Sequence, residues 1–377
     1  MAAAPSLRDT AILAVGDIAP DRADPNECFE LIRADLQRAN FAFCQLETCL
    51  TEGGLRLPQA RHAVRGRPAI AAALKSANFG VVSLASNHCM DWGGPALLET
   101  LEHLRLRGVE VVGAGANIAA ARRCVVKQVA GCRVAFLAYC SILPMGYWAE
   151  AGRVGCAPMR AFTYYEQIET DQPGTPCRTH TYAHQADLQQ LRADIEAARE
   201  LADVVMVSMH WGIHFVEAVI ADYQREVGHA AIDAGADVVL GHHAHILKGF
   251  ELYRDRPIFY SLGNFAVDLR IDAAHAASSS FREIQALNPK WVVDLEGLYN
   301  FPDDSRMTLV VEMIMNASGI EQFNLLPAYI NNRAQPRLLE PEEPLFAKVT
   351  DYLRQICLSA HLNGQCVQRG GRLALMR

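Results

Sequence analysis

The sequence predicts an α/β fold, on three observations. Apolar runs rich in β-branched residues alternate along the chain with segments that have helical spacing. Most of the predicted strands end at a polar side chain. The chain has 377 residues, of which 51% are hydrophobic and 20% are charged, and this composition suits a globular protein with a sizeable core.

The first part of the chain is expected to alternate strand and helix. The run "TAILAVGD" predicts a first strand that ends at Asp17, and "FAFCQLET" predicts a second that ends near Glu47. The segments between these runs have helical spacing with charged residues on one face, and turn residues mark their ends. The expected strands are 10–17, 41–48, 79–88 and 109–117, the expected helices are 26–39, 67–77 and 93–108, and 124–141 is expected to be a hairpin.

The second part continues the alternation after an interruption. Residues 141–185 are rich in Gly, Pro, Tyr and Trp, and are expected to form an irregular insert. Because so long a connection is unusual, the insert is a candidate wall or lid of an active site. Beyond it, helices are expected at 184–202, 223–236 and 343–362, and strands at 203–212, 237–243, 257–268 and 306–319.

Charge and cysteine content exclude several classes of protein. A net charge of −7 without a basic stripe argues against a nucleic-acid partner. No apolar run reaches transmembrane length and no export signal is evident, so we expect no membrane association. The eleven cysteines are scattered without a CxxC pair, which favours reduced thiols in a cytoplasmic protein.

Polar side chains follow five predicted strands at their carboxyl ends, which is where sites form in open α/β sheets. A single histidine there is more often structural, and Glu47 could cap a helix or Asn87 could hold a turn. Five such strand ends together indicate one shared site. The residues are Asp17, Glu47, Asn87, His88, His210, His242, His243 and His245. Asp, Glu, Asn and His ligands suit Zn, Mn or Fe, and a pair of such cations can generate hydroxide.

Several stretches resemble the CapA family, named for capsule and poly-γ-glutamate synthesis, which is similar to the calcineurin-type metallophosphatases. The resemblance covers about residues 10–270 and rests on "GDIAPDR", "CQLETCLT", "SLASNHCMDWGG", "VSMHWG", "DVVLGHHAHIL" and "YSLGNF". It implies a metallophosphatase-like β-sandwich flanked by helices, with the site at the carboxyl ends of strands. We expect this domain to occupy residues 1–330 and a helical extension to occupy residues 331–377.

The resemblance also implies roles for individual residues. Asp17 would be the first metal aspartate and Glu47 the bridging carboxylate, while His88 would face the substrate. The metal set would be Asp17, Glu47, Asn87, His210, His243 and His245, if a metal is bound. Three positions depart from the family pattern: Ala19 stands where metallophosphatases often have a histidine ligand, His214 where a glutamate is usual, and Ala244 where a proline is usual.

Three functions are compatible with these residues. Epimerisation of a peptide residue without a cofactor, as in the lasso-peptide branch of the family, is slightly favoured. The first alternative is a hydrolase of phosphoesters or amides that depends on Mn, Zn or Fe, and the second is a non-catalytic accessory protein of polymer synthesis. The catalytic candidates are His88, Asp91, His210, His242, Asp17 and Glu47, and the candidates for contact with a peptide substrate are Trp92, Trp211, His214, Tyr147, Trp148 and Asn264.

Overall fold

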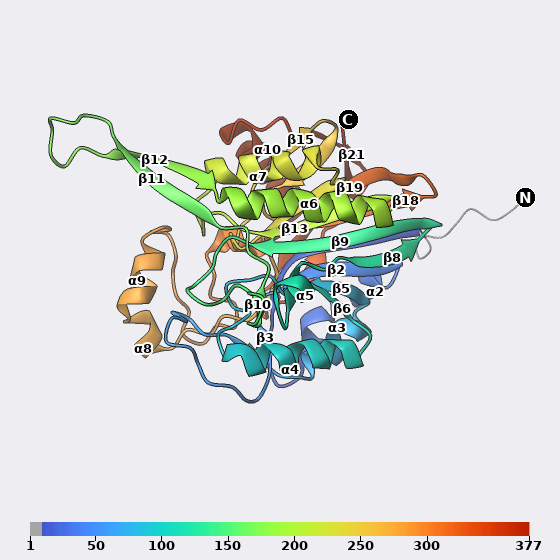
Figure 1. Cartoon of the computed structure of the whole chain (residues 1–377), viewed down its shortest axis with the longest axis horizontal. Coiled ribbons are helices and arrows are strands. Elements are labelled where there is room, and N and C mark those ends of the chain that lie inside the picture. The colour runs from blue at the N-terminus through green and yellow to red at the C-terminus, as the bar shows by residue number, and fades with distance from the viewer. Residues whose placement is uncertain (1–9, 377) are drawn as a thin grey trace, which may run out of the picture.

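Two β-sheets packed face to face form the centre of the molecule in the computed structural model, which describes residues 10–376 (Figure 1). The α/β prediction is confirmed. Aromatic side chains join the sheets: the rings of Phe41 and Phe43 in the larger sheet have centroids 5.8 and 5.7 Å from that of Phe136 in the smaller sheet. Such contacts bury apolar surface between the sheets, as expected of a sandwich.

The larger sheet is mixed and has ten strands, with β1 at its centre. β1 is parallel to β2 and β17 and antiparallel to β18. The spatial order is β21 (Cys366–Arg369), β22 (Arg372–Leu375), β19 (Gly319–Ile330), β18 (Met307–Asn316), β1 (Ala11–Ala19), β2 (Phe41–Leu46), β5 (Phe79–Ser83) and β6 (Glu110–Val112), with β17 (Asn264–Val267) on β1 and β20 (Pro336–Leu338) on β19.

The smaller sheet has six strands, and its four inner strands are parallel. Parallel neighbours require crossover connections, and for two of the three parallel pairs these contain α6 (Gln185–Leu201) and α7 (Asp222–Asp233). The spatial order is β15 (Phe250–Tyr253), β16 (Arg256–Phe259), β14 (Val238–His242), β13 (Val204–His210), β9 (Cys132–Cys140) and β8 (Val125–Val129). Nearly all residues of β9, β13 and β14 are buried, as expected of strands covered on both faces.

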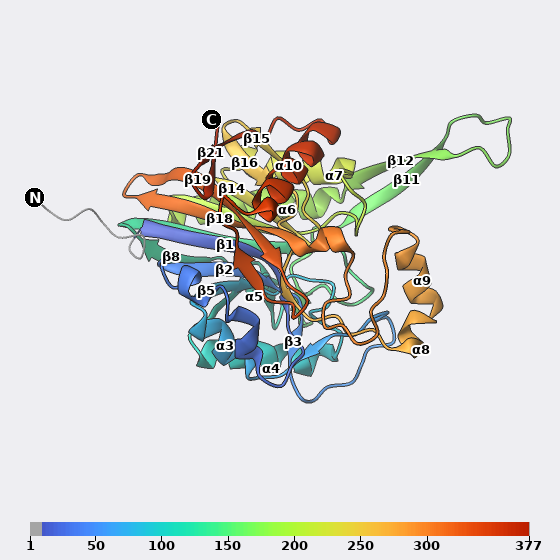
Figure 2. The same ribbon diagram turned by 180° about the vertical axis from the view of Figure 1, so that it is seen from behind.

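Helices cover the outer faces of both sheets. α3 (Ile70–Ser76) and α4 (Gly93–Leu106) contact the larger sheet, α6 and α7 contact the smaller one, and α10 (Pro344–Ser359) contacts β19 (Figure 2). The remaining elements are η1 (Pro25–Phe29), α2 (Arg33–Leu36), β3 (Cys49–Leu50), β4 (Arg65–Gly66), β7 (Ala114–Gly115), α5 (Ile118–Arg122), β10 (Gly155–Cys156), α8 (Ala273–Ala276), α9 (Ser279–Gln285) and η2 (Asp303–Arg306). Among residues 10–376, no helix combines the length and the hydropathy needed to cross a bilayer.

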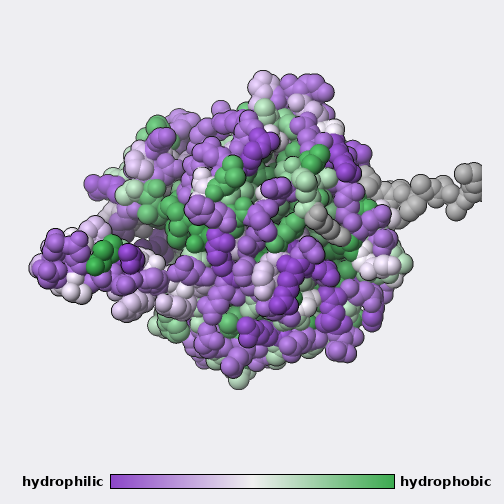
Figure 3. All heavy atoms as spheres, turned by 90° about the horizontal axis from the view of Figure 1, so that it is seen from above, coloured by the Kyte–Doolittle hydropathy of each residue, from purple (hydrophilic) through white to green (hydrophobic). Residues whose placement is uncertain are grey.

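The segment 141–185 contains regular structure that the sequence analysis did not anticipate. β11 (Ala161–Gln167) and β12 (Cys177–Ala183) pair over seven positions to form a two-stranded arm. This arm extends away from the two sheets (Figures 1 and 3). Its tyrosines are exposed, with Tyr164 and Tyr165 at 59% and 65%. The expectation of irregular structure was wrong for the arm because alternating aromatic and threonine side chains stabilise strands that pair only with each other.

The C-terminal part also differs from expectation. Residues 331–376 supply the expected helix α10, but they also supply β20, β21 and β22, which extend the larger sheet. β19 pairs with β18 over ten positions and was not predicted. These strands are short or interrupted by polar residues, and their hydrogen-bond partners are supplied by tertiary pairing rather than by local sequence.

Candidate metal centre

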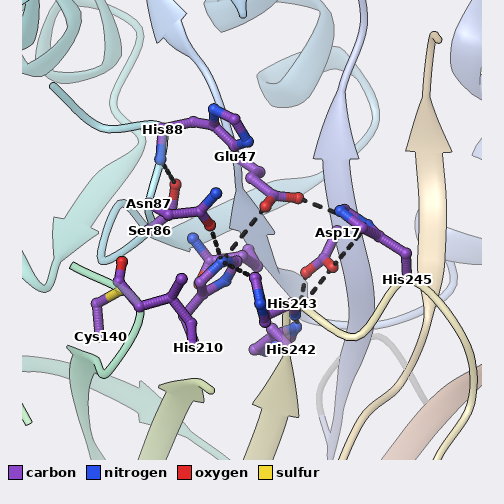
Figure 4. Close-up of polar contacts among 12 residues, drawn as sticks. Asp17, Glu47, Ser86, Asn87, His88, Cys140, His210, His242, His243 and His245 are labelled. Carbon is purple, nitrogen blue, oxygen red and sulfur yellow. Dashed lines mark hydrogen bonds and ion pairs between the residues drawn. The ribbon is translucent and has the colours of Figure 1, made fainter. Parts of the chain in front are cut away.

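The polar residues at the strand ends meet where the two sheets face each other (Figure 4). The larger sheet contributes Asp17 from β1, Glu47 just after β2, and Asn87 in the turn that follows β5. The smaller sheet contributes the end of β13 and the end of β14 with the turn that follows it. Its residues are His210, His242, His243 and His245. The site therefore depends on the packing of both sheets.

A close backbone approach positions Asp17. A Cβ atom on Gly16 would lie 2.0 Å from the carbonyl oxygen of Gly263, so only glycine fits there. The amide of Asp17 donates to that same oxygen at 3.0 Å. This pairing sets Asp17 opposite Asn264 of β17 in the register of the sheet.

The turn after β14 wraps around the Asp17 carboxylate. His243 and His245 have φ angles of 87° and 56°, in the left-handed region that side chains other than glycine seldom adopt. The amide of His243 donates to Oδ2 of Asp17 at 3.1 Å, and Nδ1 of His242 lies 3.3 Å from Oδ1 of Asp17. Backbone strain of this kind is common at functional sites, where the surrounding structure maintains it.

One group of potential metal-ligand atoms converges on Nε2 of His210. This nitrogen lies 2.6 Å from Oδ1 of Asn87, 3.3 Å from Oε1 of Glu47 and 3.2 Å from Nδ1 of His243. Each of these atoms carries a lone pair, and the His210 ring can place at most one proton among them. Hydrogen bonding alone therefore leaves the group undersatisfied, whereas a cation would satisfy all four atoms.

A second group forms around Nδ1 of His245. This nitrogen lies 2.8 Å from Oδ1 of Asn264, 3.7 Å from Oδ2 of Asp17 and 3.9 Å from Oε2 of Glu47. Glu47 thus presents one carboxylate oxygen to each group. Two sets of residues, each with ligand atoms within 4.8 Å of one another, could hold a metal ion: Glu47 with His210 and His243, and Asp17 with Glu47 and His245.

The buried carboxylates support the fit to a cation. Oδ1 of Asp17 and Oε1 of Glu47 are inaccessible to solvent and accept no hydrogen bond from any residue of the described chain. Buried polar atoms are nearly always paired, so two such oxygens in one cluster indicate a missing positive partner. Oxygen and imidazole donors together suit a borderline divalent ion such as Mn, Fe or Zn.

Burial also sets the ionisation of the cluster. It raises the pKa of Glu47 to about 7, and it lowers the pKa of His210 to about 4 and that of His243 well below its usual value. Burial would likewise raise the pKa of Asp17, but the imidazole of His242, 3.3 Å from Oδ1, and the rings of His210 and His245 hold that pKa below its usual value. His210 and His243 are therefore neutral near pH 7, the state in which imidazole binds metals.

His88 belongs to a separate hydrogen-bonded unit beside the cluster. Its Nδ1 lies 2.7 Å from Oδ2 of Asp91, whose other oxygen accepts from the hydroxyl of Tyr147 at 2.8 Å. Burial opposes protonation of His88, but the charge and hydrogen bond of Asp91 outweigh it and raise its pKa. With a side chain 16% exposed, His88 is the more accessible member of the unit.

Sequence comparisons identify the family. A family described as "Bacterial capsule synthesis protein PGA_cap" matches residues 11–269, more than half of the chain. This chain belongs to the PGA_cap family. The CapA resemblance is thereby confirmed, and with it the metallophosphatase-like fold class.

Three relatives carry related descriptions. "PGA biosynthesis protein CapA" of Bacillus subtilis (strain 168) is 32% identical over 196 residues, which is 52% of this chain and 44% of the relative. "Capsule biosynthesis protein CapA" of Bacillus anthracis is 31% identical over 196 residues, or 52% and 42%. A "Probable polyglutamine synthesis accessory protein" of Mycobacterium tuberculosis (strain ATCC 25618 / H37Rv) is 31% identical over 241 residues, or 63% and 57%. The match spans about half the length of these relatives.

Several predicted residues of this PGA_cap member do not face the cluster. Trp211 is fully buried, and its indole donates to the carbonyl of Tyr260 at 3.0 Å, so the prediction that it contacts substrate is not supported. Trp148 lies beside Glu150 and lines a separate cavity of about 290 Å³. Trp92 donates to the carbonyl of Val64 at 3.0 Å. The indole N–H of each of these rings is already paired within the fold, and contact of Trp92 or Trp148 with substrate stays a prediction.

Other predicted residues act through a neighbour. Tyr147 and Asp91 are buried, and Asp91 is hydrogen-bonded to both Tyr147 and the more accessible His88. His242 is fully buried beneath Asp17, which suits orientation of that carboxylate rather than contact with substrate. The ring of His214, which occupies the position of the usual glutamate, lies 3.8 Å from that of His243 between centroids.

The structure gives one predicted residue a different place, and it adds one residue that the sequence analysis missed. Asn264 was expected to contact substrate, yet its Oδ1 joins the second donor group, near the end of β1, where Ala19 replaces the usual histidine. His62 lies close to His88, with ring centroids 6.4 Å apart. No strand precedes His62, so the strand-end pattern could not have identified it.

Proposed function

We propose that this PGA_cap member is a divalent-metal-dependent hydrolase that cleaves an amide or phosphoester bond. The observation that carries the proposal is the convergence of three lone-pair atoms on Nε2 of His210. Acid–base chemistry without metal does not require this convergence, because a proton on Nε2 of His210 can serve only one of the lone pairs that face it. The sequence analysis favoured epimerisation over hydrolysis. Because of this convergence we now place hydrolysis first.

The chain's own residues account for the remaining requirements of hydrolysis. A bound cation would supply hydroxide and polarise the scissile group. Glu47 presents one oxygen to each donor group and so would hold both ends of the centre together. Protonated His88 would donate its Nε2 proton to the leaving group, since Nδ1 is engaged by Asp91. Tyr147 donates to Asp91 and thereby fixes the orientation of that pair.

The test uses protein stripped of metal with a chelator and then reloaded with Mn, Zn or Fe. Substrates would be α- and γ-glutamyl peptides, phosphomonoesters and phosphodiesters. We expect hydrolysis of one class, lost on chelation and restored by metal, and lost in His210→Asn. His103→Asn is the matched control, because His103 lies on the exposed side of α4 and is paired with Glu99 at 3.2 Å. Unchanged activity after chelation would contradict the proposal.

Peptide epimerisation is the second candidate. His88 and His245, with side chains 16% and 11% exposed, lie on either side of Glu47 (Figure 4). Two imidazoles on opposite sides of a substrate could remove and return an α-proton. In deuterated water this reaction would introduce deuterium at the α-carbon, in the presence of chelator. Hydrolysis would leave the α-carbon unlabelled.

A non-catalytic role is the third candidate, because one relative is described as an accessory protein. An accessory protein needs no intact metal centre. It would therefore show no turnover of any substrate class after metal loading, and His210→Asn would leave its biological role unchanged. A peptide substrate, the absence of a nucleic-acid partner and a cytoplasmic location remain part of the proposal.

A further inference from the structure

Two histidines outside the metal centre lie beside His88. The rings of His62 and His275 have centroids 4.9 Å apart, and the ring of His62 meets that of His88 edge-on at 6.4 Å. His62 comes from the loop between β3 and β4, and His275 comes from α8. Figures 1 and 2 both show that loop running beside α8. Segments more than 200 positions apart in the sequence thus bring three imidazoles into a row.

The ring nitrogens of this row are largely free. Within residues 10–376, His62 and His275 make ring contacts but their imidazole nitrogens have no hydrogen-bond partner. His88 uses Nδ1 for Asp91 and leaves Nε2 without a protein partner. Both His62 and His275 are only partly exposed. Partly buried donors without partners favour a ligand that accepts hydrogen bonds.

The charges around the row favour an anionic ligand. Burial, with smaller contributions from His88, His275 and Arg56, lowers the pKa of His62 to about 4, although the charge of Asp91 opposes this shift. Arg61, next to His62, pairs with Glu283 of α9 at 3.9 Å. Asp91 is already occupied by His88, Tyr147 and the amide of Val64, and Asp272 accepts from the amide of His275.

We propose that His62 and His275, beside His88, form a subsite for an anionic oxygen group of the substrate, either a carboxylate or a phosphate. His62 and His275 would donate their N–H groups to the anion, and Arg56 would add favourable charge. His88 would border the subsite and keep its Nε2 proton for the leaving group. The subsite adjoins His88, so the anionic group would lie next to the bond that reacts. The placement of the anion next to the reacting bond rests on the proposed function. Binding of the anion can nevertheless be measured without turnover.

The test measures binding to metal-free protein, so that it stands apart from catalysis. The imidazole resonances of histidine-labelled protein would be followed by NMR during titration with inorganic phosphate and, separately, with glutarate. We expect the signals of His62 and His275 to shift with one of these probes. The double variant His62→Asn, His275→Asn should bind that probe at least about tenfold more weakly, because hydrogen bonds to a charged group are lost.

Controls separate the possible outcomes. His103→Asn should bind as the wild type does, and the melting temperature of the double variant reports whether it is folded. Should phosphate alone bind, the substrate group is a phosphate, and should glutarate alone bind, it is a carboxylate. Equal affinity of wild type and double variant for both probes would overturn the subsite. Binding that is lost in the variant while no hydrolysis is found would retain the subsite and reject the proposed function.

A kinetic measurement adds an independent check once a substrate is known. When both proteins are loaded with metal, KM for an anionic substrate should be about tenfold higher in the double variant than in the wild type. KM for a neutral analogue should be the same in both. An equal rise of KM for both substrates would show general disturbance of the site rather than recognition of charge.

Discussion

At the scale of single residues, burial decides how the metal centre is charged. Glu47 is 2% exposed and carries a pKa near 7, while His210 is neutral until about pH 4. The sequence predicted these residues from their places at strand ends. It could not predict that Asn264 would join the donors or that His62 would lie beside His88, because both placements arise from contacts between distant segments.

Metal affinity should depend on pH through Glu47. A cation binds only the carboxylate form, so below about pH 7 each binding event must displace a proton from Glu47. We expect the affinity for Mn to fall about tenfold per pH unit below 7 and to level off above it. His210 is already neutral in this range and adds no dependence. Calorimetric titration between pH 5.5 and 8.5 would measure this.

The variant Glu47→Gln tests whether Glu47 causes this pH dependence of metal affinity. Its amide does not ionise, so the slope attributed to Glu47 should disappear as metal affinity falls. An unchanged slope in this variant would assign the pH dependence to another residue. Glu102→Gln, on the exposed side of α4, provides the matched substitution away from the site.

Tyr147 should act by positioning rather than by contact with substrate. Tyr147→Phe removes only the hydroxyl that donates to Asp91 at 2.8 Å. The Asp91–His88 pair should then be less well oriented, lowering kcat about tenfold with KM unchanged. Because the Tyr147 hydroxyl no longer shares the negative charge of Asp91, the pKa of His88 should rise, and the alkaline limb of the pH–rate profile should move to higher pH. A loss of thermal stability without either kinetic change would show that Tyr147 is purely structural.

At the scale of elements, the strands that carry the site were predictable and the arm was not. β1, β2, β13 and β14 are continuous apolar runs that burial on both faces favours. β11 and β12 lie in a segment rich in Gly and Pro, and their strand structure depends on mutual pairing. α8 and α9 were also missed, since helices of four and seven residues carry little periodic signal.

The arm should be dispensable for folding. Its base is held by β12, where the amides of Thr181 and Ala183 donate to Asp222 and Glu226, whereas the outer residues are mostly exposed. Replacing residues 164–180 with Asn-Gly should shift the melting temperature by no more than about 3 °C. Leu191→Ala, in the buried face of α6, is the destabilising comparison and should lower it by several degrees. Failure of the shortened chain to fold would contradict this prediction.

At the scale of the whole molecule, the metal centre joins the two sheets. Asp17, Glu47 and Asn87 come from one sheet, and His210, His243 and His245 come from the other. An ion held by both sheets binds the folded chain far better than the unfolded chain. Binding should therefore stabilise the fold by about 2.7 kcal/mol when the free ion is present at 100 times its dissociation constant.

This linkage predicts a rise in melting temperature when Mn, Zn or Fe is added to chelator-treated protein. For a chain of this size the rise should be about 3–8 °C. Differential scanning calorimetry would measure it, with His210→Asn as the variant in which the rise should shrink. Equal rises in both proteins would indicate binding elsewhere on the surface.

The position of the arm in the sequence has a practical consequence. Its tip, near Gly174, divides the chain into a fragment with Asp17, Glu47 and Asn87 and a fragment with His210, His243 and His245. A chain cut at this exposed tip would give two pieces, each with half of the ligands. Their reassembly could be followed by the return of metal binding, so the fold is suited to conversion into a split-protein complementation reporter.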